Sequence, residues 1–126
     1  MQLVTNENAH ELQAKLCDRA HDHVGFDTEC HGPRFNDSSA RKPRLNAYRS
    51  QITGFSVAFL DGSSYYVPIA HVGENVDKDT WLALLDSLLS RPGTIWVHNV
   101  KFELQVLQLL GYTLMELIQT RFRCTQ

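Results

Sequence analysis

The spacing of apolar residues along the chain predicts a series of short strands and helices. Apolar residues that recur every three or four positions indicate an amphipathic helix, and apolar residues that alternate with polar ones indicate a strand. By this rule we expect strands over 2–5, 23–28, 52–60, 65–69 and 94–98, and helices over 7–19, 77–90, 100–110 and 114–118.

Turn and capping residues mark several of these boundaries. Asp61 and Gly62 separate two β-prone runs, which predicts an antiparallel hairpin. Asn6 and Asn99 stand where helix N-caps are expected, and Gly111 stands where the helix over 100–110 ends. Strands and helices alternate through the second half of the chain, so the predicted fold class is α/β, with a sheet and helices in layers.

Length and composition indicate one small folded domain. Of its 126 residues, 43% are hydrophobic and 21% are charged, which argues against a disordered chain. Apolar runs stay below the roughly 18 residues of a membrane-spanning helix, and the N-terminus has no apolar signal core. Three widely spaced cysteines form neither a disulfide framework nor a paired zinc motif, so we expect a reducing, cytoplasmic location.

The net charge of −2 hides an uneven distribution. Residues 31–50 contain five basic side chains and one acidic side chain, while the rest of the chain contains seven basic and thirteen acidic ones. The segment is rich in Gly, Pro, Asn, Ser and Arg and shows no periodicity, which predicts a long loop over 31–47. Such a loop is either a contact for a polyanion or a solvated surface, and the sequence leaves both interpretations open.

Two acidic residues stand together at the end of the strand predicted over 23–28. Asp27 and Glu29 are two positions apart, so both carboxylates project from one face, roughly 7 Å apart at their bases. Gly25 precedes them on that face and leaves space for a ligand. Convergent carboxylates suit Mg²⁺ or Mn²⁺. The alternative is that the strand ends here and both side chains are solvated.

Glu103 interrupts an apolar stripe on the helix predicted over 100–110. Val100, Leu107 and Leu110 share its face, where packing would favour another apolar residue. One explanation is structural, because the helix dipole favours an acid near the N-terminus. The other is functional: the stripe faces the strand that carries Asp27, and Glu103 adds a third carboxylate to a cation cluster.

Polar residues also surround the start of this helix. His98, Asn99 and Lys101 lie at a strand-to-helix junction, where backbone amides and polar side chains often hold phosphate groups. Capping and solvation are the alternative explanation for the same residues.

Four segments, in order along the chain, resemble one family of nucleases. Residues 24–29 (Val-Gly-Phe-Asp-Thr-Glu) resemble the first motif of the 3'-5' exonucleases with a ribonuclease-H-like fold, and residues 98–103 (His-Asn-Val-Lys-Phe-Glu) resemble the second. Residues 52–58 and 65–71 are similar to the second and third strands of the proofreading domain of family A DNA polymerases, bacterial or phage. The resemblance implies a mixed sheet flanked by helices.

It also implies a two-metal phosphodiesterase that removes nucleotides from a single-stranded DNA 3' end, working beside a C-terminal polymerase domain in a bacterial or phage-infected cell. Asp27, Glu29 and Glu103 would be the catalytic carboxylates and would hold two divalent cations, Mg²⁺ or Mn²⁺. Five residues around the two motifs would contact the nucleic acid: Thr28, His98, Asn99, Lys101 and Phe102.

The sequence departs from the family pattern at two points. The family usually has Asp where this chain has Glu103, and the longer side chain would shift the second cation or adopt another rotamer. The third motif, a Tyr or His followed four residues later by Asp, would lie beyond Gln126, so we expect residues 1–126 to be the N-terminal part of an exonuclease domain. Two other functions stay open: an inactive nucleic-acid-binding or structural domain, and an exonuclease of the same fold that acts on RNA.

Overall fold

The structure, a computed structural model, describes residues 1–31 and 51–125. The predicted strands and helices are all present within these ranges. Residue 31, where the predicted loop was expected to begin, is instead the last residue of a strand; the rest of that loop and the basic side chains of residues 31–50 lie outside the described residues. In chain order the elements are β1 (Gln2–Leu3), α1 (Ala9–Asp18), β2 (Val24–His31), β3 (Gln51–Phe59), β4 (Ser64–Pro68), α2 (Lys78–Ser90), β5 (Ile95–Val97), α3 (Val100–Leu109), α4 (Leu114–Ile118) and β6 (Phe122–Cys124).

The strands of the described residues form one six-stranded mixed sheet in the order β1-β4-β3-β2-β5-β6. β3 is antiparallel to both β2 and β4, which confirms the predicted hairpin. β1 is parallel to β4, and β5 is parallel to both β2 and β6. The predicted fold class, a mixed sheet with flanking helices, is therefore confirmed, and β2 lies in the interior of the sheet.

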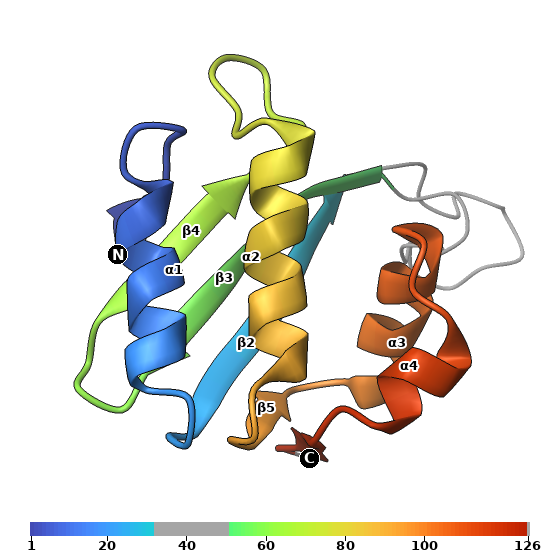
Figure 1. The fold of residues 1–126 in the computed structure, drawn as a ribbon. Helices are drawn as coiled ribbons and strands as arrows, with labels where there is room; N and C mark the ends of the chain where they lie inside the picture. Colours follow the sequence, from blue (N-terminus) through green and yellow to red (C-terminus); the bar gives the residue numbers. More distant parts are fainter. Residues whose placement is uncertain (32–50, 126) are drawn as a thin grey trace, which may run out of the picture.

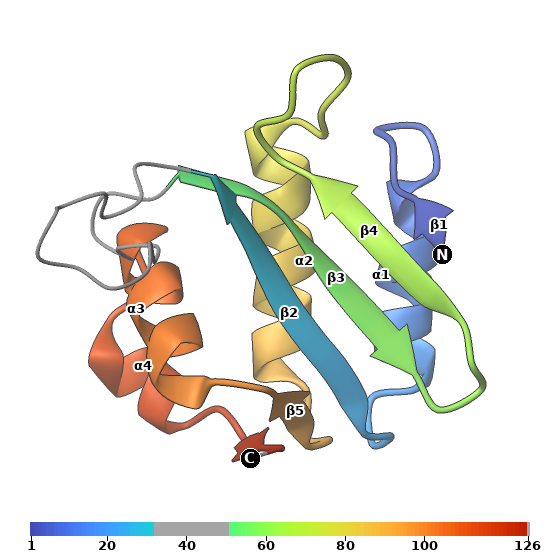
Figure 2. The ribbon, with the colours of Figure 1, turned by 180° about the vertical axis from the view of Figure 1, so that it is seen from behind.

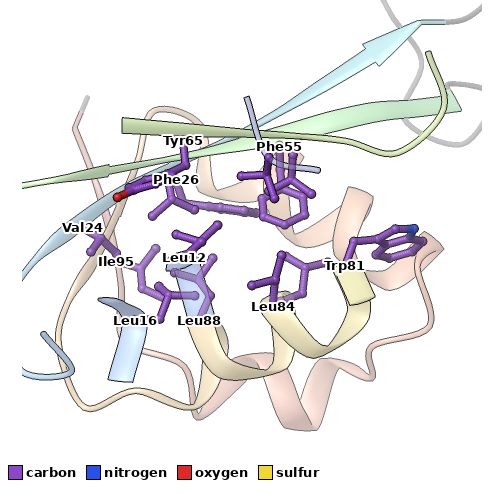
Figure 3. Close-up of a cluster of buried hydrophobic side chains, with 14 of the residues drawn as sticks. Leu12, Leu16, Val24, Phe26, Phe55, Tyr65, Trp81, Leu84, Leu88 and Ile95 are labelled. Carbon is purple, nitrogen blue, oxygen red and sulfur yellow. The ribbon is translucent and has the colours of Figure 1, made fainter. Parts of the chain in front are cut away.

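Helices α1 and α2 cover one face of the sheet (Figure 1). Their apolar stripes pack against every second side chain of the strands, and each fully buried Leu or Phe contributes about 2 kcal/mol. Because strand side chains alternate between faces, the positions between these core residues project away from the helices. Figure 3 shows part of this core, with Leu12 and Leu16 from α1, Trp81, Leu84 and Leu88 from α2, and Val24, Phe26, Phe55, Tyr65 and Ile95 from the sheet.

The opposite face of β2, β3 and β4 has no described helix lying over it, as Figure 2 shows. α3 and α4 lie beside the sheet, next to β2 and β5, in both views. Small residues of the central strand β3, namely Gly54, Ser56 and Ala58, are the partners of β2 residues on this face. We call this surface of β2, β3 and β4 the open face.

Two local features differ from the prediction. α1 begins at Ala9 with Asn8 as its N-cap, so the prediction that Asn6 caps it is wrong. Asn6 Oδ1 instead accepts a hydrogen bond of 2.9 Å from the backbone N–H of Asp77, which joins the first loop to the start of α2. β6 was not predicted, because three residues that depend on pairing with β5 give no periodic signal of their own.

Other boundaries agree with the prediction. Gly111 has φ of 109° just after α3, a left-handed conformation that glycine adopts without a steric penalty. Among the helices that the structure describes, none has the length and apolar character needed to cross a membrane. The thiols of Cys17, Cys30 and Cys124 are free.

Candidate active site

β2 presents Asp27 and Glu29 on the open face of the sheet. Phe26 and Thr28 alternate with them and are buried, whereas both acidic side chains are exposed. Asp27 lies opposite Ser56, and Glu29 lies opposite Gly54. The prediction that the two carboxylates share one face is confirmed. β2 continues to residue 31, so the strand does not end at the acidic pair.

Glu103 reaches the edge of β2 from α3. Its side chain is 3% exposed and accepts hydrogen bonds of 2.7 Å from the Thr28 hydroxyl and 3.4 Å from the Thr28 backbone N–H. β5 pairs with β2 at Val24 and Gly25, so the N–H of Thr28 lies beyond that ladder and needs another acceptor. The acidic position in the apolar stripe of α3 therefore faces β2, as predicted. Glu103 supplies the hydrogen-bond acceptor that this edge of β2 needs.

The environment of Glu103 favours its protonated form. Burial raises the pKa of its carboxyl group to about 7; the hydrogen bonds from Thr28 oppose this shift, and the nearby Asp27 carboxylate adds to it. The charge of Glu103 also affects Cys30. Burial is the main cause that raises the pKa of the Cys30 thiol, and the charge of Glu103 adds to it. The fold thus holds two acidic groups, Asp27 and Glu103, close enough to repel each other, and a cation between them would remove this repulsion.

Glu29 takes part in a different set of contacts. The Tyr66 hydroxyl donates a hydrogen bond of 3.2 Å to Glu29 Oε2, and His71 Nε2 lies 2.5 Å from the same hydroxyl. Burial raises the pKa of Tyr66; a hydrogen bond with Thr53 opposes this shift, and the Glu29 charge adds to it. Glu29 is therefore held by β4 and the segment that follows it, on the side away from α3.

The three predicted carboxylates thus divide into a pair and a single residue. Within 1–31 and 51–125, no group of three or more His, Cys, Asp or Glu side chains is arranged to hold a metal ion. The oxygen donors of Asp27 and Glu103 fit one Mg²⁺ or Mn²⁺. Glu29 shares the open face with Asp27, and its Oε1, which Tyr66 does not contact, is available as a further ligand oxygen.

The residues predicted at the start of α3 form its N-terminus. Asn99 Oδ1 accepts a hydrogen bond of 3.1 Å from the Phe102 backbone N–H, which confirms the capping explanation for Asn99. His98 Nδ1 lies 3.3 Å from Thr125 Oγ1, Lys101 is exposed and Phe102 is half-buried. This terminus lies one helical turn before Glu103, so it borders the acidic pair.

Sequence reasoning missed Tyr66 and His71 as possible members of the site. Residues 65–69 were predicted as a hairpin strand and residues 65–71 as similar to a strand of the family, and neither prediction gave these two side chains a role. The hairpin register carried a usable signal, because Tyr66 lies opposite Ser56 and Ser56 lies opposite Asp27. Alternation along β4 therefore places Tyr66 on the open face together with the acidic residues.

A comparison with protein families and curated proteins gives one partial match. No family model matches the chain. DNA polymerase I of Pseudomonas aeruginosa is 35% identical to it over a 68-residue alignment, which covers 50% of this chain and 7% of that protein.

Solved structures give matches over most of the chain. The RNase domain of the yeast Pop2 protein superposes with a TM-score of 0.63 and 12% identity, and the match covers 89% of this chain and 58% of that one. A chain from the structure of the yeast NOT1 MIF4G domain co-crystallized with CAF1 superposes with a TM-score of 0.56 and 13% identity, and the match covers 95% of this chain and 59% of that one. S. pombe Pop2p with bound Mg²⁺ and Mn²⁺ superposes with a TM-score of 0.53 and 11% identity, and the match covers 97% of this chain and 65% of that one.

These similarities establish the fold. The described residues have the fold of these solved structures, a six-stranded mixed sheet flanked by helices, which is the ribonuclease-H-like architecture that the resemblance implied. The chain spans less than two thirds of each similar structure and a small part of the polymerase.

Proposed function

We propose that this chain is a 3'-5' exonuclease that hydrolyses the terminal phosphodiester bond of single-stranded DNA, as the proofreading module of a DNA polymerase. The observation that carries the proposal is the approach of Glu103 to Asp27, which brings acids from two separate motifs to one edge of β2. The fold shared with the RNase domain of the yeast Pop2 protein and the partial match to a DNA polymerase I support it.

Asp27 and Glu103 would hold a divalent cation, Mg²⁺ or Mn²⁺, and Glu29 would serve a second one. Pop2p of S. pombe, a protein of similar fold, has been solved with both kinds of ion bound. Two such cations would activate the attacking water and stabilise the departing 3' oxygen. Thr28 keeps the Glu103 carboxylate in place, because its hydroxyl and its backbone N–H bind the two carboxylate oxygens.

The start of α3 would contact the terminal nucleotides. Lys101 offers an exposed positive charge to the phosphate backbone, and the half-buried ring of Phe102 offers an apolar surface to a base. Asn99 would act through the helix terminus that it caps, and His98 flanks that terminus. Thr28 is buried against Glu103, so we assign it to the carboxylate rather than to the nucleic acid.

RNA is a second candidate substrate, since one of the similar structures is described as an RNase domain. The carboxylate pair serves DNA and RNA alike, because the reacting phosphodiester is the same in both. An inactive binding module is a third candidate, favoured because the described residues contain no group of three or more His, Cys, Asp or Glu side chains arranged around one ion.

A cleavage assay separates these candidates. Single-stranded DNA and RNA of one sequence, labelled at the 5' end, are incubated with the chain and Mg²⁺. We expect stepwise shortening of the DNA from its 3' end, which a chelator stops and which Asp27→Asn and Glu103→Gln abolish. Asp18→Asn, which changes an exposed acid at the end of α1, is the matched control and keeps the activity.

Other outcomes contradict the proposal in different ways. Faster shortening of RNA than of DNA would mean that RNA, and not DNA, is the substrate. Binding of either strand without shortening would support the inactive module. Shortening that survives Asp27→Asn would place the active site elsewhere.

A further inference from the structure

Tyr66 and His71 form a hydrogen-bonded relay that ends on Glu29 and that the reaction described above does not use. The Tyr66 hydroxyl lies 3.2 Å from Glu29 Oε2 and 2.5 Å from His71 Nε2, and the two rings meet edge to face at 5.5 Å. A carboxylate only accepts hydrogen bonds, so the Tyr66 O–H points to Glu29. His71 Nε2–H then donates to the Tyr66 oxygen, in the neutral and in the charged form of the imidazole alike.

The His71 end of the relay is fixed to the sheet. The backbone N–H groups of Ile69 and Ala70 donate to the Thr53 carbonyl at 2.8 and 3.1 Å. The backbone N–H of His71 donates to Asn75 Oδ1 at 2.7 Å, and Asn75 Nδ2 donates back to the His71 carbonyl at 2.9 Å. The turn that carries the imidazole is therefore closed on itself and tied to β3.

Gly54 provides the space in which Tyr66 reaches Glu29. It lies opposite Glu29 on β3, and a Cβ at this position would collide with the Tyr66 hydroxyl and lie 2.7 Å from the Val67 carbonyl oxygen. Any larger residue here would push the phenol ring away. β3 therefore has no side chain at the position that Tyr66 of β4 passes over to reach Glu29 of β2.

We propose that Tyr66 and His71 are positioning residues that hold the exposed Glu29 carboxylate in one orientation on the open face, beside Asp27. This inference rests on the proposed function, in which Glu29 is a cation ligand. Tyr66 occupies Oε2, so we assign Oε1 to the cation. Hydrogen-bond partners of this kind orient a ligand oxygen before the metal binds.

Calorimetric titration of the full chain with Mn²⁺ tests the consequence for the metal. Removing the Tyr66 hydroxyl with Tyr66→Phe, or the imidazole with His71→Ala, is expected to weaken Mn²⁺ binding about 10-fold. Tyr65→Phe is the matched control, because Tyr65 is the neighbouring tyrosine and is buried in the core against Phe59. His10→Ala, an exposed histidine of α1, is the control for His71→Ala.

A metal-free measurement tests the positioning itself. With ¹³C-labelled glutamate side chains, the Glu29 carboxyl signal in NMR spectra is expected to shift in Tyr66→Phe and in His71→Ala, and to stay unchanged in Tyr65→Phe. An unchanged Glu29 signal in both relay variants would overturn the inference, even where Mn²⁺ binding depends on Asp27. Mn²⁺ binding that is indifferent to Asp27→Asn would instead overturn the proposed function, with the Glu29 signal still reporting on the relay.

Discussion

Glu103 is an acid with 3% exposure on an otherwise apolar stripe of α3. Periodicity alone left a structural and a functional explanation in balance, and the structure gives weight to both. Its two bonds from Thr28 complete the edge of β2, and its nearness to Asp27 creates a pair of acids that a cation would stabilise. An apolar residue would fill the same space, but it would leave the Thr28 N–H without an acceptor.

Glu103 makes the metal-free chain less stable as the pH rises. Its pKa is about 7 in the folded state against an ordinary value of 4.5, so between these values the folded chain holds a proton that the unfolded chain has lost. The stabilisation is complete below the unfolded pKa and disappears as the pH rises through the folded pKa. We expect a loss on the order of 2–3 kcal/mol in the free energy of unfolding across this window.

Urea unfolding at about pH 4.5 and about pH 8, in chelator, measures this loss. Glu103→Gln removes the titrating group and is expected to flatten the dependence, while Glu116→Gln, an exposed acid of α4, leaves it in place. An equally steep dependence in Glu103→Gln would show that another group causes it.

At the residue scale, the sequence predicted which side chains face the site but not how they bond. Asp27 and Glu29 follow from the two-residue period of a strand, and Glu103 follows from the period of a helix. The bond from Tyr66 to Glu29 depends on the register of three strands. The hairpin turn sets the register of β4 against β3, but no local pattern determines the register of β2 against β3.

The strands and helices themselves were predictable because most carry their own apolar period. α2 and α3 have stripes of buried residues, and β2 and β3 alternate between core and open face. β6 has no such period, and the N-terminal cap of α1 was misplaced because Asn6 bonds to Asp77 across the molecule. Elements whose limits depend on tertiary contacts were the ones that local patterns missed.

Two glycines of the open face are expected to respond differently to substitution. Gly54→Ala forces a Cβ against the Tyr66 hydroxyl and the Val67 carbonyl oxygen, so we expect a loss of about 2 kcal/mol or more in the free energy of unfolding. Gly25→Ala places its Cβ at an ordinary 3.8 Å from the Ala58 Cβ, and we expect a change of less than about 1 kcal/mol. Denaturant unfolding of both variants checks this, and equal losses would contradict the packing of β3 described above.

At the scale of the whole molecule, the open face combines acids with an exposed surface. Outside residues 31–50 the chain carries seven basic and thirteen acidic groups, a balance that repels nucleic acid. A divalent cation bound at Asp27 and Glu103 would make the local charge positive, and a phosphate group could then bind there. The basic side chains of residues 31–50 lie outside the described residues, so their contact with a DNA strand stays a prediction.

Cation binding is expected to release a proton from this site. Glu103 is largely protonated below its pKa of about 7, and a cation binds its ionised form. Calorimetric titration with Mn²⁺ at about pH 6, in buffers of different ionisation enthalpy, is expected to show proton release that decreases by about pH 8. No difference between buffers at the lower pH would mean that the cation does not bind Glu103.

A crystal of the chain grown with Mn²⁺ would show whether Asp27 and Glu103 form the cation site of a nuclease. Anomalous diffraction locates the ion without reference to activity or substrate. We predict a Mn²⁺ peak within coordination distance of carboxylate oxygens from both Asp27 and Glu103, and its loss in Asp27→Asn. A crystal with no Mn²⁺ between Asp27 and Glu103 would contradict this assignment, whether or not Mn²⁺ binds at Glu29.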